Sequence, residues 1–133
     1  MKYFLMITII SLTFIKAEIQ LIVSSSCNIE QLTKQEIKNL FMLKKTNIRN
    51  QYMVVINSKN KELYTKFSKK YIGKTILNMK VYWTRMLFTG RKIAPKKCFK
   101  YELDELKGNE TCYLSYIKEI EDKPDKWRKL LIQ

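Results

Sequence analysis

Residues 52–57, which read Y-M-V-V-I-N, and the helix pattern that follows them set the expected fold. The segment is apolar and rich in β-branched residues, which is typical of a buried strand. Asn60 is a good capping residue for a helix at 61–72, and Gly73 fits the left-handed position that ends such a helix. Apolar residues recur at the spacing i, i+4, i+8 of one helical face, namely Leu63, Phe67 and Tyr71. A strand followed directly by a helix indicates an α/β protein.

Further strands and helices alternate on both sides of this unit. We expect strands at 18–23, 98–101, 112–117 and 127–132, and helices at 33–43, 76–88 and 102–107. Thr33 and Glu36 have the spacing of a capping box, which supports the start of the first of these helices. The alternation predicts an α/β fold with a mostly parallel sheet flanked by helices. The chain has 133 residues, and we expect a single domain over 18–133.

Residues 1–17 have the layout of a secretory signal peptide. Lys2 gives a positive start, residues 3–15 are almost entirely apolar, and Ala17 is a small residue at a plausible cleavage point. The apolar run is shorter than the roughly 20 residues of a membrane span. We therefore expect a periplasmic protein whose mature form begins at Glu18. The alternative is an uncleaved signal segment, which would then be the protein's only attachment to the membrane.

The charge and the missing residue types restrict the function classes. The chain carries 26 Lys and Arg against 12 Asp and Glu, for a net charge of +14, and it has no His. Nucleic-acid binding is one explanation of such charge. However, 22 of the 26 basic residues are Lys, and they are spread along the chain rather than clustered, so we expect no nucleic-acid partner. The lack of His excludes His-based triads and metal sites, and no pair of carboxylates has a spacing that suggests acid–base catalysis. We expect neither an enzyme nor a cofactor or metal site.

Three cysteines, Cys27, Cys98 and Cys112, allow three different disulfides. Cys98 and Cys112 begin two expected strands that are joined by a short helix, and such a unit can bring the two strand ends together in a sheet. We therefore predict a Cys98–Cys112 bridge with Cys27 free. A bridge that includes Cys27 is the alternative.

Four segments support a family resemblance through their order. They read L-T-K-Q-E-I at 32–37, V-V-I-N at 54–57, Y-W-T-R at 82–85 and L-S-Y-I at 114–117. The set resembles the short exported relatives of the periplasmic phosphate-binding proteins of ABC transporters. The resemblance implies a periplasmic-binding-protein-like fold with roughly one of the two lobes that close over an oxyanion in the full-length members.

The sequence departs from this family where phosphate is held. The full-length members have a Ser-Gly-Thr element at a helix N-terminus. The matching stretch here, at 57–62, reads N-S-K-N-K-E. The resemblance therefore implies that any oxyanion is bound weakly, no tighter than about millimolar.

Candidate ligand-binding residues lie at the ends of two expected strands and in one helix. Ligands gather beyond the carboxyl ends of strands in open α/β sheets. The candidates are Ser24, Ser25 and Ser26, then Asn57, Ser58 and Lys59, and finally Arg85. Each group also has a purely structural explanation: a polar turn for the serines, helix capping beside solvated lysines for the second group, and an internal ion pair for the arginine.

Two functions remain open after these observations. The first is an exported, non-enzymatic, solute-binding-like domain whose ligand is a small anion. The second is an envelope interaction protein that keeps the fold but has lost the ligand site. The expected partners are accordingly a small anion, or an envelope or transporter protein.

Overall fold

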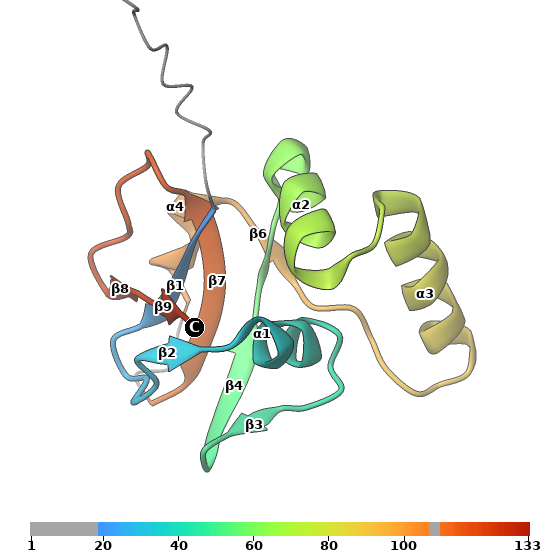
Figure 1. The fold of residues 1–133 in the computed structure, drawn as a ribbon, viewed down its shortest axis with the longest axis horizontal. Coiled ribbons are helices and arrows are strands. Elements are labelled where there is room, and N and C mark those ends of the chain that lie inside the picture. The colour runs from blue at the N-terminus through green and yellow to red at the C-terminus, as the bar shows by residue number, and fades with distance from the viewer. Residues whose placement is uncertain (1–18, 107–109) are drawn as a thin grey trace, which may run out of the picture.

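The computed structural model describes residues 19–106 and 110–133 (Figure 1). The expected signal peptide at 1–17 lies outside the described residues. The elements in chain order are β1 (Ile19–Ser24), β2 (Gln31–Leu32), α1 (Lys34–Phe41), β3 (Asn47–Ile48), β4 (Gln51–Val55), β5 (Asn57–Ser58), α2 (Lys61–Phe67), the π-helical turn η1 (Ser68–Ile72), α3 (Ile76–Phe88), β6 (Lys97–Cys98), α4 (Lys100–Leu103), β7 (Cys112–Lys118), β8 (Trp127–Lys129) and β9 (Leu131–Ile132). Within the described residues, no helix has both the length and the apolar character to cross a membrane.

The expected α/β class is confirmed, and the main sheet has mixed strand directions. Its five strands lie in the order β3-β4-β7-β1-β8. β4 and β7 are parallel, as expected for strands joined through helices, whereas β1 is antiparallel to both of its neighbours, β7 and β8. β3 and β4 also pair antiparallel. The sheet is therefore mixed rather than mostly parallel, because alternation along the chain does not determine the direction in which the first strand joins the sheet.

A tight hairpin between β3 and β4 accounts for one antiparallel pair. Its two turn residues, Arg49 and Asn50, have φ angles of 46° and 66°. Two left-handed residues in a two-residue turn match the twist of the flanking strands. The sequence lacks the Asn-Gly or Asp-Gly signal of such a turn, so this hairpin was not predicted.

Both faces of the sheet are covered, which explains the unbroken apolar character of β1. Leu21 and Val23 belong to a core cluster with residues of α1, α2 and η1, whereas Ile22 belongs to a second cluster with Leu103 of α4 and Trp127. Successive side chains of a strand point to opposite faces. A strand between two cores therefore needs apolar residues at consecutive positions.

Three aromatic rings form the centre of the larger core. The ring of Phe67, in α2, stacks on the ring of Tyr116, in β7, with centroids 3.8 Å apart and planes 5° apart. Phe41, in α1, meets Phe67 edge-on at 4.6 Å. These contacts join α1 and α2 to the middle strand of the sheet.

Local signals in the sequence account for the starts of α1, α2 and α3, whereas the expected strand at 98–101 and helix at 102–107 are wrong in their bounds, because β6 ends at Cys98 and α4 spans Lys100–Leu103. Thr33 and Glu36 form the capping box of α1, and Thr75 caps α3 through the backbone N–H of Asn78. The expected helix at 61–72 is α2 continued by η1, and it ends at Gly73 with a φ of 77°. Gly fits this position because a side chain would strain the left-handed backbone.

The disulfide predicted from the sequence is wrong. Cys27 is bonded to Cys112, with Cα atoms 4.7 Å apart, and Cys98 is a buried free thiol. The antiparallel register sets Val23 of β1 opposite Leu114 of β7, so the chain just beyond β1 lies beside the start of β7. Cys27 and Cys112 share the larger core, whereas Cys98 belongs to the second cluster. Strand register, and not proximity in sequence, decides the pairing.

Candidate functional site

Ser24 ends β1, and Ser25 and Ser26 follow it. Hydrogen bonds from this serine segment connect the end of β1 to the start of β7. The hydroxyls of Ser24 and Ser26 both donate to the carbonyl oxygen of Thr111, at 3.1 and 2.8 Å. The Ser24 hydroxyl also accepts a hydrogen bond from the backbone N–H of Tyr113 at 2.9 Å. Two of the three serine side chains thus hold β1 against the start of β7. Ser25 is exposed and lines a shallow hollow with its two neighbours.

Asn57 is buried at the start of β5, with 2% of its surface exposed. Its side-chain Oδ1 accepts a hydrogen bond from the Tyr116 hydroxyl at 2.9 Å, and that hydroxyl accepts one from the backbone N–H of Ser58 at 3.2 Å. Burial raises the pKa of Tyr116 far above its ordinary value, so the hydroxyl keeps the proton that it donates. This chain of hydrogen bonds fixes which end of the amide is the oxygen.

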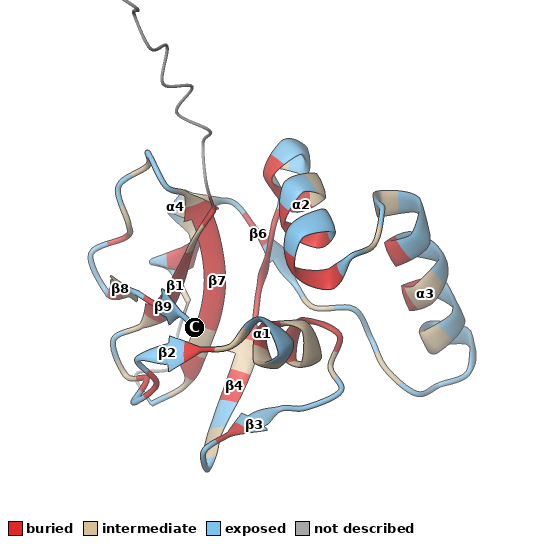
Figure 2. Ribbon diagram, viewed as in Figure 1, coloured by how far each residue is buried: buried red, intermediate tan, exposed pale blue. Residues whose placement is uncertain are grey.

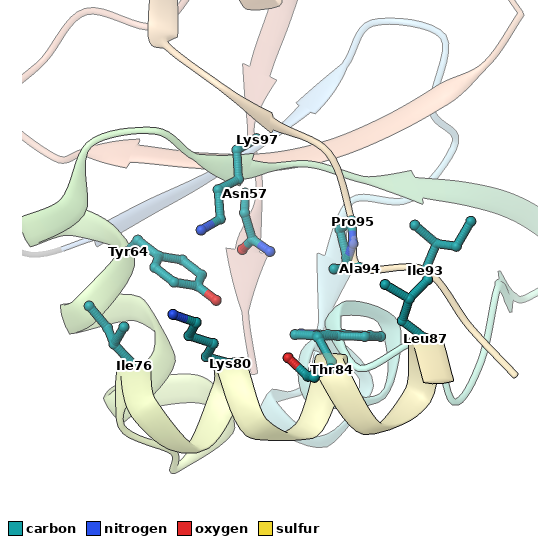
Figure 3. Close-up of a pocket in the computed structure, with 11 residues that line it drawn as sticks. Asn57, Tyr64, Ile76, Lys80, Thr84, Leu87, Ile93, Ala94, Pro95 and Lys97 are labelled. Carbon is teal, nitrogen blue, oxygen red and sulfur yellow. The ribbon is translucent and has the colours of Figure 1, made fainter. Parts of the chain in front are cut away.

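The other end of the Asn57 amide is available for a ligand. Among the described residues, its Nδ2 has no hydrogen-bond acceptor. Figure 3 shows the amide directed away from β5 and across a pocket toward α3. Among the described residues the buried side-chain atom without a partner is Ser68 Oγ and not Asn57 Nδ2, so Nδ2 reaches the solvent of the open pocket, where an anion or a water molecule can accept its hydrogen bond.

Lys97 lies beside Asn57 because of strand pairing. β5 and β6 are parallel, and Asn57 is the register partner of Lys97. The Lys97 ammonium lies over the ring of Tyr64, in α2, at 4.1 Å from the centroid. Lys80 approaches from α3 on the other side of the same space (Figure 3). Neither lysine forms an ion pair with a carboxylate of the residues that the structure describes.

These groups line one pocket, which we call the β5–α3 pocket. Its volume is about 460 Å³. The residues that line it are Asn57, Tyr64, Ile76, Lys80, Trp83, Thr84, Leu87, Ile93, Ala94, Pro95 and Lys97. Two cations and one amide donor therefore face a space that has no acidic residue in its lining, and this arrangement attracts anions.

Ser58 and Lys59 are engaged in local structure. The Ser58 hydroxyl accepts a hydrogen bond from the backbone N–H of Asn60, which itself caps α2 through Leu63 N–H. The Lys59 ammonium lies 3.0 Å from a carboxylate oxygen of Glu102. The hydrogen bond that the ammonium donates to Glu102 raises the pKa of Lys59. These two residues therefore stabilise the turn that carries Asn57.

Arg85 lies on the outer face of α3. It is exposed and lines a neighbouring hollow with Leu77, Val81 and Phe88, and this hollow shares Lys80 and Thr84 with the β5–α3 pocket. The structure thus distributes the sequence-predicted site residues over several places, and Asn57 is the candidate that lines the β5–α3 pocket.

Sequence reasoning did not identify the lysines of the pocket. Lys80 could have been found, because Ile76, Lys80 and Thr84 follow at i, i+4, i+8 and so share one helical face. Lys97 gave no such signal, since it lies 40 positions from Asn57 and only the pairing of β5 with β6 brings the two together. Within the described residues there is no cluster of three or more His, Cys, Asp or Glu that could hold a metal ion.

Comparisons with known proteins support the fold. No protein-family model and no curated protein matches the chain. A solved structure from Clostridium perfringens, described as a phosphate ABC transporter substrate-binding protein with bound phosphate, is similar, with a TM-score of 0.58 and 16% sequence identity. The match covers 86% of this chain and 44% of that protein. The expected periplasmic-binding-protein-like fold is thereby confirmed as a distant likeness, and this chain covers less than half the length of that protein.

Proposed function

We propose that this chain is an exported, non-enzymatic binding module that holds a small anion weakly in the β5–α3 pocket. The observation that carries the proposal is the convergence of the Asn57 amide, Lys80 and Lys97 on one space. The bound phosphate of the structurally similar protein supports an anion as the ligand. A transporter would be the partner of such a module, as the name of that protein suggests.

The affinity should be low and should depend on salt. The pocket is open, so a bound anion stays in contact with water, where charge interactions are weak and screened. We expect a dissociation constant for inorganic phosphate of about 1 mM, which corresponds to roughly 4 kcal/mol. Isothermal titration of residues 18–133 at two salt concentrations measures both properties.

Two substitutions test the location of the site. Asn57→Asp keeps the oxygen that accepts from Tyr116 and replaces the amide donor by an anionic oxygen, so it should abolish phosphate binding. Lys97→Met should weaken binding at least threefold. Lys45→Met, an exposed lysine of the loop after α1, removes the same charge elsewhere and serves as the control. Equal losses in the two lysine variants would show that only the net charge matters, and would contradict a site.

Export has its own test. The layout of residues 1–17 supports cleavage before Glu18 and a periplasmic location. Intact-mass measurement of the protein from the envelope fraction should show a chain that begins at Glu18. A full-length cytoplasmic product would contradict the proposal.

A second candidate function is that of an envelope interaction protein. The outer face of α3 favours it, because Leu77, Val81 and Phe88 are 68%, 48% and 86% exposed. Apolar groups gathered on one face often mark a contact surface. If this function is the correct one, the chain should elute with an envelope protein in size-exclusion chromatography, Phe88→Ser should abolish that co-elution, and phosphate should bind neither to the native chain nor to the variant.

A further inference from the structure

The β5–α3 pocket has two chemically different ends (Figure 3). Asn57, Lys97, Tyr64 and Lys80 surround one end, where Ile76 lies beside Tyr64. Leu87, Ile93, Ala94 and Pro95 lie at the other end, on the last turn of α3 and on the loop that leads to β6. The polar groups that attract an anion are therefore confined to one side of the space.

The size of the pocket exceeds what a bare oxyanion needs. A volume of about 460 Å³ lies within the range of roughly 300–1,000 Å³ that is usual for sites of organic ligands. Inorganic phosphate held by Asn57 and Lys97 would leave the other end of the pocket filled with water. Water against apolar walls is unfavourable, so the empty end favours a larger ligand.

The apolar end is exposed when nothing is bound. Leu87 is 60% exposed and Ile93 is 77% exposed, whereas Trp83, which also lines the pocket, is 9% exposed. A ligand with an apolar body would remove the two aliphatic side chains from water. Burial of apolar surface is favourable, so a body of ring size would increase the affinity.

We propose that the β5–α3 pocket selects organic anions, in which a phosphate or carboxylate group is carried on a flat apolar body of about one aromatic ring. The anionic group lies between the Asn57 amide and the ammonium groups of Lys97 and Lys80. The apolar body lies against Leu87, Ile93 and Pro95. This inference rests on the anion site proposed above and adds the class of ligand.

Three aromatic probes of similar size and different charge test the inference by isothermal titration. Phenyl phosphate should bind at least tenfold more tightly than inorganic phosphate. Benzoate should also bind more tightly than inorganic phosphate, and the neutral benzyl alcohol should bind at least tenfold more weakly than phenyl phosphate. Phenyl phosphate should in addition change the fluorescence of Trp83, which lines the pocket.

Two substitutions in α3 test where the apolar body of the ligand binds. Leu87→Ser should weaken phenyl phosphate at least threefold and leave inorganic phosphate unchanged. Val81→Ser is the matched control, because Val81 lies in the hollow on the outer face of α3 and is also exposed. It should change neither affinity. Both positions are exposed, so both variants should fold.

The outcomes separate this inference from the proposed function. If phenyl phosphate and inorganic phosphate bind equally, or if Leu87→Ser has no effect on either, the preference for organic anions is overturned and the anion site stands. If benzyl alcohol binds as tightly as phenyl phosphate, the pocket is an apolar site and both proposals fail. If no anion binds, the proposed function fails and the inference fails with it.

Discussion

β7 and α3 are both rich in apolar residues, yet these residues are mostly buried in β7, whereas most of them are exposed or partly exposed in α3. In β7, Leu114, Tyr116 and Ile117 are at most 2% exposed. In α3, the buried residues are Met79 and Trp83, whereas four other large apolar side chains are exposed: Leu77, Val81, Leu87 and Phe88. Figure 2 shows the contrast between the buried sheet and the mostly exposed α3, and Figure 1 shows α3 on the far side of α2 from β1 and β7.

The difference in burial indicates that β7 contributes mainly to the stability of the fold, whereas the exposed residues of α3 are available for contacts with other molecules. β7 has strand partners on both sides and core clusters on both faces, so five of its seven residues are buried. α3 is anchored along one stripe and presents its remaining surface to the β5–α3 pocket and to solvent. Substitutions in the sheet should therefore reduce the free energy of unfolding, whereas substitutions at the exposed positions of α3 should have little effect on it.

Removal of the disulfide at the start of β7 should cause the largest loss in the free energy of unfolding. Replacing Cys27 and Cys112 together by Ala opens a link between residues that are 85 positions apart. The chain-entropy model gives a loss of about 4.5 kcal/mol for such a loop. Urea denaturation measures the loss, with Cys98→Ala as the control for a buried thiol. A double variant as stable as Cys98→Ala would show that strand pairing alone holds β1 against β7.

A substitution in the aromatic centre of the larger core should cause the second largest loss in the free energy of unfolding. Phe67 is fully buried and stacks on Tyr116. Phe67→Ala should cost about 3–5 kcal/mol, because it removes a buried ring and leaves a cavity that the sheet cannot fill. The same denaturation experiment measures the loss. A loss below about 1 kcal/mol would mean that α2 contributes little to the core.

Tyr116 connects the two regions, since its hydroxyl orients Asn57 in the pocket. Burial raises the pKa of Tyr116, so the folded state holds the phenol proton more tightly than the unfolded chain, in which tyrosine titrates near pH 10. This group therefore contributes stability that is fully present below about pH 10 and is lost as the pH rises further.

Tyr116→Phe should change both stability and its dependence on pH. At neutral pH it should cost about 1–2 kcal/mol, because it leaves Asn57 Oδ1 and Ser58 N–H without their partner. Above about pH 10 the decline in stability should be shallower than in the native chain, as seen by urea denaturation at a series of pH values. Tyr52→Phe is the control, since Tyr52 is 58% exposed. Parallel pH profiles of the native chain and Tyr116→Phe would contradict the role assigned to this burial.

The smallest change in stability is expected on α3. Phe88→Ser replaces a side chain that is 86% exposed, so the free energy of unfolding should change by less than about 0.5 kcal/mol. Thermal and urea denaturation beside Phe67→Ala make the comparison direct. A loss of several kcal/mol would show that Phe88 is buried in solution, for example by a second copy of the chain.

The local elements were predictable because short-range contacts fix them. The capping box of Thr33 and Glu36, the cap at Thr75 and the left-handed Gly73 each depend on residues within a few positions of one another. The bounds of α3 and the start of β7 were therefore predicted to the residue.

Long-range pairing decided the rest. The sequence identified Asn57 as a candidate, but its neighbour Lys97 comes from β6, and the partner of Cys112 comes from the segment after β1. Both pairings depend on the direction and register of the strands. The sequence does not specify these, because many segments of similar apolar character fit the same strand pattern. The sequence by itself thus determined the α/β class and the starts of the capped helices α1, α2 and α3, through local hydrogen bonds and periodicity. Only the tertiary structure decided which strands are neighbours, and with them the disulfide and the groups that face one another in the pocket.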